Sequence, residues 1–308
     1  MRERVLAVLG ALCLIAVAVL VRSAIVGDDD ADSGSGDGSA SVVACSPSLA
    51  ELCDALAESG TIAADPPSLP LADASNPPDD VDAWIAWYPG PQLANLDASA
   101  ANDPEPWTGM TTVASGTLGV VGRASTIRSV CSDQTTWTCL GDAGVEGSAT
   151  IGVGDPSTDE GLVRLAPLAR ATADDPTDGF TLDPNLDTIV QGPEATQDTA
   201  SAMAEALVTR LGSVDLVIGP MALLDAAAAT PQGQQRQLEA RAAIEEQQVR
   251  VVAAWSDDDG RAVAEDLCQQ EALAEALAAI GLAADCEAAP MGENEAGFLY
   301  QVRERVSG

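Results

Sequence analysis

The sequence predicts an α/β protein. Short runs of apolar, β-branched residues alternate with amphipathic stretches of helical period along most of the chain. The clearest strand candidates are 42–45, 81–88, 214–218 and 249–255, and the clearest helix candidates are 49–57, 196–211 and 262–280. This alternation is typical of a largely parallel sheet covered by helices.

The first strand-to-helix unit contains the first candidate ligand contacts. Val42–Cys45 reads as a buried strand, Pro47 ends it, and Ser48 is a suitable N-cap for the following helix. One apolar helical face is formed by Leu49, Leu52, Cys53, Leu56 and Ala57. The hydroxyls of Ser46 and Ser48 then lie at the carboxyl end of the strand, where open α/β sheets bind ligands. A capped unit without a ligand fits the same residues.

The second strand, 81–88, is rich in aromatic residues and is followed by Pro89-Gly90-Pro91. Trp84 and Ile85 are expected in the core. Trp87 and Tyr88 stand where the strand opens into a turn and could form an aromatic wall over a ligand.

A second strand-to-helix unit follows a long strand at 111–123, whose small central residues suit a hinge. Residues 149–154 form the strand, 155–160 the turn, and Leu162–Leu168 the helix, which Pro167 is expected to cut short. Two such helix starts facing each other across a cleft would clamp a small ligand. A plain capping box of Ser157 or Thr158 with Glu160 explains this turn equally well.

The remaining segments continue the alternation. Residues 176–193 are rich in Pro, Asp and Gly and read as a loop, and 196–211 form an amphipathic helix. The polar stretch Gln232–Gln248 is expected to be helical before the strand at 249–255.

Composition excludes several kinds of chemistry. The 308-residue chain has a formal net charge of −34 and contains no histidine and no lysine. A Ser-His-Asp triad, a Schiff-base lysine, a P-loop lysine and imidazole metal ligation are therefore excluded. Such a negative charge repels phosphate backbones, so nucleic acid is not an expected partner. No cofactor and no metal site are expected.

Residues 1–27 are expected to anchor the chain in a membrane. Val5–Val21 is an unbroken run of apolar or small residues preceded by Arg2 and Arg4. Extended to Val26, it is long enough to span a bilayer as a single helix, with the bulk of the chain outside. A cleaved signal peptide is the alternative. Residues 28–40 are acidic and rich in Gly and Ser, which is typical of a solvated linker.

Six cysteines follow the anchor. An even number in an exported chain indicates disulfides, although six cysteines allow 15 connectivities. Because the cysteines fall into three pairs that are close in sequence, we expect sequential pairing of Cys45 with Cys53, Cys131 with Cys139, and Cys268 with Cys286.

The segment VRVVAAWSDDDGRAVAEDLCQQEALAEALAAIGL resembles the closing segment of type II extracellular solute-binding proteins. In that family a strand is followed by a helix, a break and a second helix ending in Gly and a large apolar residue. Here these are Ala262–Cys268, Gln269–Gln270, Glu271–Ile280 and Gly281–Leu282. The opening VVACSPSLAEL is similar to the first strand and ligand-contacting turn of the same family, in particular its membrane-tethered members from high-GC Gram-positive bacteria.

The resemblance implies two α/β lobes joined by a hinge, the type II periplasmic-binding-protein-like fold. Lobe 1 would comprise 41–115 and 249–308, and lobe 2 would be 116–248. The implied ligand contacts are Ser46, Ser48, Trp87, Tyr88, Ser115, Thr117, Asp155, Ser157 and Thr158. Residues 28–308 hold 11 arginines against 47 acids, so a neutral or cationic solute is easier to accommodate than an anion. Arginines that could still contact an anion are Arg123, Arg128, Arg164 and Arg170.

The expected function is capture of a small ligand by a protein tethered to the cell membrane, for uptake through a transporter permease or for sensing. A ligand-free cell-surface scaffold of the same fold is the alternative. A glycosidase-like enzyme would need two carboxylates about 5–10 Å apart in the cleft. Acids are too abundant here for any pair to indicate one, so we do not expect an enzyme.

Overall fold

The computed structural model describes residues 42–173, 181–190, 199–209, 214–287 and 294–307. The expected anchor at 1–27, the linker at 28–40, and residues 176–180 and 191–193 of the expected loop lie outside the described residues. Within the described part of that loop, Asp187–Val190 is helical, so the loop prediction is wrong there. Within the described ranges, no helix combines the length and the apolar character needed to cross a bilayer.

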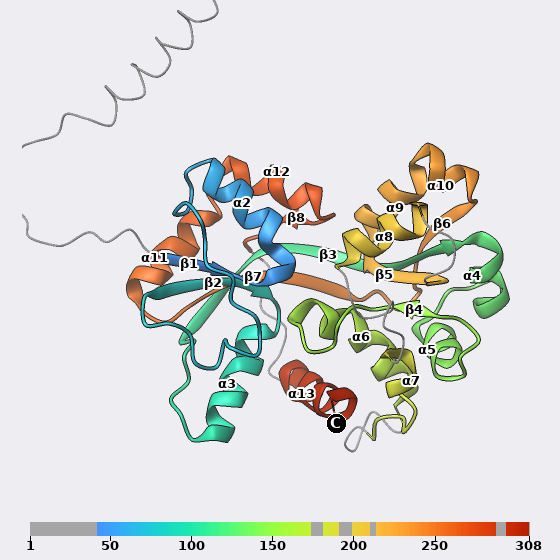
Figure 1. The fold of residues 1–308 in the computed structure, drawn as a ribbon, viewed down its shortest axis with the longest axis horizontal. Coiled ribbons are helices and arrows are strands. Elements are labelled where there is room, and N and C mark those ends of the chain that lie inside the picture. The colour runs from blue at the N-terminus through green and yellow to red at the C-terminus, as the bar shows by residue number, and fades with distance from the viewer. Residues whose placement is uncertain (1–41, 174–180, 191–198, 210–213, 288–293, 308) are drawn as a thin grey trace, which may run out of the picture. The chain divides into compact units, whose positions relative to one another are not determined.

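The described chain is built on an eight-stranded sheet with helices on its faces (Figure 1). Its strand order is β1-β2-β7-β3-β5-β4, and β6 and β8 each pair with β3. The strands are β1 Val42–Cys45, β2 Val81–Trp87, β3 Gly109–Arg123, β4 Ile151–Gly152, β5 Leu216–Pro220, β6 Leu238–Ala242, β7 Gln248–Trp255 and β8 Ala283–Ala284.

The sheet is mixed, so the prediction of a largely parallel sheet is wrong. β1 pairs with β2 and β4 with β5 in parallel, as strands joined through helices do. β3 is antiparallel to β5, β6, β7 and β8, and β2 is antiparallel to β7. The alternation of elements along the sequence gives no information on these long-range partners.

β3 divides the sheet into two halves. Gly109–Thr117 pairs with β7, whereas Leu118–Arg123 pairs with β5 and β6. We call β1, β2, β7, β8 and Gly109–Thr117 the first half, and β4, β5, β6 and Leu118–Arg123 the second half. The predicted strand at 111–123 is confirmed, and the change of partners falls next to Ser115–Thr117, the segment expected to act as a hinge.

Helices cover both halves and agree in type with most of the predicted segments. A 3₁₀ helix at Pro47–Leu49 precedes α2. The α-helices are α2 Ala50–Glu58, α3 Gly90–Ala101, α4 Ala124–Cys131, α5 Trp137–Val145, α6 Asp159–Thr172, α7 Asp187–Val190, α8 Ala200–Thr209, α9 Met221–Ala229, α10 Pro231–Gln235, α11 Asp258–Leu267, α12 Glu271–Ala279 and α13 Asn294–Ser307.

The helix predicted over Gln232–Gln248 is wrong. α10 ends at Gln235, Gln237 takes a left-handed conformation with φ of 58°, and β6 follows. β6 lies antiparallel to β3, with Val120 opposite Arg241. This pairing supplies backbone hydrogen-bond partners that outweigh the helix propensity of a polar segment.

Two local predictions about helix ends are also wrong. α6 continues through Pro167 to Thr172, and its residues from Asp159 to Ala169 are buried. Packing over that length offsets the hydrogen bond that proline cannot donate. Ser48 is not an N-cap, because it lies inside the 3₁₀ helix and α2 begins after Leu49 without a side-chain cap.

Three disulfides join Cys45 to Cys53, Cys131 to Cys139, and Cys268 to Cys286. This is the sequential pairing expected from the spacing. The first disulfide ties the end of β1 to α2 and so holds the turn that carries Ser46 and Ser48.

The main core lies between the sheet and its helices. Trp84 and Ile85 are fully buried, which confirms their predicted place in the core. Trp84 contacts Trp107, with 5.4 Å between ring centroids. A smaller apolar cluster in the second half surrounds Val121, Val217 and Leu224.

Candidate functional site

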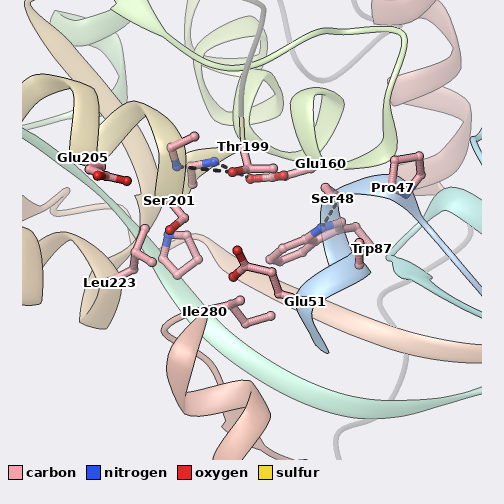
Figure 2. A pocket seen from close by; sticks show the side chains of 14 residues that line it. Pro47, Ser48, Glu51, Trp87, Glu160, Thr199, Ser201, Glu205, Leu223 and Ile280 are labelled. Atoms are coloured by element: carbon pink, nitrogen blue, oxygen red, sulfur yellow. Dashed lines mark hydrogen bonds between the residues drawn. The ribbon is translucent and has the colours of Figure 1, made fainter. Parts of the chain in front are cut away.

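A cavity of about 320 Å³ lies between the two halves (Figure 2). On the side of the first half it is lined by Pro47, Ser48, Ala50, Glu51, Trp87 and Ile280, and on the side of the second by Glu160, Thr199–Ala202, Glu205, Pro220 and Leu223. Its size is at the lower end of the range of about 300–1,000 Å³ typical of small-molecule sites.

The first turns of four helices contribute to this wall. Glu51 belongs to the start of α2, Glu160 to the start of α6, and Ala200 begins α8, while Pro220 immediately precedes α9. Helix N-termini carry unpaired N–H groups and a partial positive charge, so this convergence is suited to holding negatively charged oxygens.

Asp159 supplies such oxygens from within the protein. Its Oδ2 accepts hydrogen bonds from Ser46 Oγ at 2.6 Å and from the backbone N–H of Trp87 at 2.9 Å. Its Oδ1 accepts from the backbone N–H of Glu160 at 3.0 Å. Burial raises the pKa of Asp159, and the hydrogen bonds from Ser46 and Trp87 oppose that rise only in part. Asp159 therefore links the start of α6 to the ends of β1 and β2.

Glu160 forms a buried ion pair beside it. Its Oε1 accepts from the backbone N–H of Ala200 at 2.8 Å and from Arg164 Nη1 at 3.4 Å. Burial raises the pKa of Glu160 and lowers that of Arg164, and the attraction between the two charges opposes both shifts. Arg164 also donates to the carbonyls of Ile218 at 2.7 Å and Gly152 at 3.1 Å.

Two of the predicted ligand contacts, Ser48 and Trp87, line the cavity. The indole N–H of Trp87 donates to Ser48 Oγ at 3.1 Å (Figure 2). Ser46 lies behind this wall, where its hydroxyl is bound by Asp159.

The next three predicted contacts are not among the residues that line the cavity. Tyr88 is fully buried, and its backbone N–H donates to the carbonyl of Arg250. In β3, Ser115 donates to Asp285 at 2.7 Å and Thr117 hydrogen-bonds Glu246 at 3.3 Å. Both hydroxyls are thus engaged with other segments.

The turn at 155–158 approaches the cavity without lining it. Asp155 and Ser157 are exposed and hydrogen-bonded to each other, and Thr158 is the N-cap of α6, accepting from Gly161 N–H at 3.1 Å. The residues that reach the site come just after this turn, at the start of α6. Ligand contact by any of the nine predicted residues stays a prediction.

Sequence reasoning missed the carboxylates that line the cavity, Glu51, Glu160 and Glu205. Among 48 acids, nothing in their local sequence distinguishes them. It also missed Leu223, in the first turn of α9, and Ile280, at the C-terminal end of α12.

The arginines proposed as anion contacts do not line the cavity. Arg164 is buried behind Glu160, and Arg170 pairs with Glu295 at 2.6 Å. Arg123 lies at a separate surface hollow next to Arg236. As for metals, the described residues contain no group of three Cys, Asp or Glu side chains placed to hold an ion.

The chain is similar to known proteins in structure but not in sequence. No protein-family model matches the chain, and no curated protein matches its sequence. The periplasmic binding protein AfuA from Actinobacillus pleuropneumoniae, with fructose-6-phosphate bound, superposes with a TM-score of 0.52 at 14% identity, over 86% of this chain and 95% of AfuA.

Two further structures are similar over comparable lengths. A protein from Bordetella parapertussis described as an extracellular solute-binding protein gives a TM-score of 0.50 at 10% identity, over 86% of this chain and 96% of its own. Iron-bound HitA from Pseudomonas aeruginosa gives 0.48 at 12% identity, over 86% and 97%. With a mixed sheet whose long strand β3 serves both halves, the chain has the fold of the type II periplasmic solute-binding proteins.

Proposed function

We propose that this chain is an extracellular solute-binding protein that captures a small ligand between two lobes, for uptake or sensing. The observation that carries the proposal is the cavity of about 320 Å³, whose walls come from both halves of the sheet. AfuA, which shares the fold, holds fructose-6-phosphate.

The proposal includes the lobe boundaries and the tether. Residues 41–115 and 249–308 would form lobe 1 and 116–248 lobe 2, with Ser115–Thr117 as the hinge. Residues 1–27 would hold the protein at the cell membrane with its bulk outside, where it would deliver its ligand to a permease or a sensor. The three disulfides support an oxidising compartment.

Thermal unfolding of the full-length protein in the presence of a ligand panel tests this function. The panel contains phosphate, sulfate, glucose, single amino acids, putrescine and divalent metal chlorides. A ligand at 100 times its dissociation constant should stabilise the fold by about 2.7 kcal/mol. A flat response to the whole panel would favour the ligand-free scaffold.

Two variants on α8 test whether stabilisation by a ligand results from binding in the cavity. Ser201 is exposed and lines the cavity, so Ser201→Trp should fill it and abolish the stabilisation. Thr209, exposed at the other end of the same helix, provides the control Thr209→Trp, which should keep the response. Equal loss in both variants would place the ligand elsewhere.

The scaffold alternative rests on one observation. Asp159 joins Ser46 and Trp87 of the first half to the start of α6 through buried hydrogen bonds. Halves joined by a carboxylate of the protein itself would suit a rigid surface for another protein. The absence of catalysis stays a prediction.

A further inference from the structure

The charged side chains that line the cavity are of one sign. Among the described residues of its wall they are Glu51, Glu160 and Glu205, which come from α2, α6 and α8. Glu51 and Glu205 are exposed, so their carboxylates are hydrated and accessible to a ligand, whereas Glu160 is almost entirely buried. Figure 2 shows the three carboxylates around the same space, with Trp87 beside Glu51.

Arg164 does not neutralise the negative charge that the cavity presents to a ligand. It is 1% exposed, and its guanidinium is directed to Glu160 and to the carbonyls of Ile218 and Gly152. It therefore compensates the one buried carboxylate and leaves the two exposed ones facing the cavity without a basic neighbour in the described wall.

Several donors that an oxyanion would need here are already used by the protein. Ser46 Oγ and the backbone N–H of Trp87 donate to Asp159, and the backbone N–H of Ala200 donates to Glu160. The indole N–H of Trp87 is used by Ser48. Trp87 lines the cavity but is only 4% exposed, so what it offers a ligand is the part of its ring that reaches the wall, and aromatic rings attract cations.

From these observations we infer that the cavity takes a small organic cation, such as an alkylammonium or a diamine, and rejects oxyanions. The two exposed glutamates bind the positive group, and Asp159 and Glu160 accept from the backbone at the starts of α6 and α8, two of the helix N-termini that would otherwise attract an anion. This inference rests on the proposed function and specifies the ligand class of the same site.

The test is isothermal titration of the full-length protein with five probes: putrescine, tetramethylammonium, phosphate, acetate and glucose. Sodium chloride keeps the ionic strength equal in every titration, because surface attraction depends on salt. The expected result is saturable binding of at least one of the two cations and none of phosphate or acetate.

Matched charge variants on α2 locate the binding. Glu51→Gln removes a carboxylate from the wall and should weaken cation binding about three- to tenfold, the effect of one unit charge at close range in a hydrated site. Glu58→Gln removes an exposed carboxylate from the last turn of the same helix, away from the cavity, and should change the affinity less than about twofold.

Two results would overturn the inference while keeping the proposed function. The first is binding of phosphate, acetate or glucose that Ser201→Trp abolishes, with no binding of either cation. The second is cation binding that Glu51→Gln and Glu58→Gln weaken equally, which would mean that the overall charge of the protein attracts the cation. Failure of every probe to bind would overturn the inference alone, whereas a flat thermal response to the wider ligand panel would overturn the proposed function as well.

Discussion

The side chain of Asp159, at the start of α6, hydrogen-bonds Ser46 and Trp87 of the first half. Its carboxylate is fully buried, yet the groups that hydrogen-bond it are neutral: a hydroxyl and two backbone N–H groups. Hydrogen bonds to neutral donors do not fully replace the hydration lost by a carboxylate, which is why burial raises its pKa.

This raised pKa predicts a pH dependence of stability. The folded state holds the Asp159 proton at pH values where the unfolded chain, with an ordinary pKa near 3.8, has released it. The contribution of this group to stability therefore falls as pH rises from the unfolded pKa through the higher folded one. Glu160, whose pKa is also raised, acts in the same direction, although Arg164 opposes it.

We expect Asp159→Asn to remove that dependence. The carbonyl oxygen of asparagine can still accept from Ser46 and Trp87 without a buried charge. The stability of the variant relative to the native protein should therefore be greater at pH 7.5 than at pH 5, as measured by urea unfolding. Asp54→Asn, at an exposed site on α2, is the control and should give the same difference at both pH values. If Asp159→Asn changed the free energy of unfolding by the same amount at pH 5 and pH 7.5, the prediction would be wrong.

At the scale of elements, the position of α6 decides where Asp159 and Glu160 lie. The turn before it folds back so closely that a Cβ on Gly161 would lie 1.9 Å from the carbonyl oxygen of Asp155. Because this neighbour is backbone, it cannot move aside as a flexible side chain could. The absence of a side chain at Gly161 is what allows Thr158 to cap the helix at this point.

Two glycine-to-alanine variants in helices should therefore have opposite effects. Gly161→Ala should destabilise the protein by about 2–4 kcal/mol, since the turn and α6 must separate. Gly297→Ala, at an exposed position of α13 with no atom near the added Cβ, should stabilise it by roughly 0.5–1 kcal/mol through helix propensity. Urea unfolding measures both, and a neutral Gly161→Ala would show that the close approach is not maintained in solution.

At the scale of the whole molecule, α13 connects parts that the sequence assigns to different lobes. It packs against α3 as well as against α6 and α7. Arg303 pairs with Asp97 of α3, and Glu295 pairs with Arg170 of α6. The C-terminal helix therefore restrains relative movement of the two sides, together with Asp159.

The net charge of −34 predicts that salt stabilises this protein. Excess like charge opposes the compact state, and screening weakens that repulsion as the Debye length falls to a few ångströms. Raising sodium chloride from 0.02 to 0.5 M should increase the melting temperature of the full-length protein by about 3–6 °C, or roughly 1–2 kcal/mol at this size. A melting temperature that stays constant or falls would mean that the ion pairs outweigh the general repulsion.

Much of the fold could be predicted from local patterns. The strand at 81–88, the long strand at 111–123 and the helices after 258 follow from hydrophobic period, and the disulfides follow from cysteine spacing. The polar residues of Gln232–Gln248 do not reveal β6, because this strand depends on pairing with β3. Pro167 does not end α6, because the stabilisation from burying this helix exceeds the local destabilisation by the proline.

The sequence by itself determined the alternation of strands and helices, the disulfide pairing, the exclusion of histidine and lysine chemistry and the negative net charge of the chain. Tertiary structure decided which acids line the cavity. Glu51 and Glu160 are 109 residues apart along the chain and Glu205 follows 45 residues later, and the tertiary arrangement of α2, α6 and α8 brings them to one cavity. Local sequence shows secondary-structure propensity and the periodicity of buried residues. The contacts between distant segments depend on strand pairing and packing, which a short stretch of sequence does not contain.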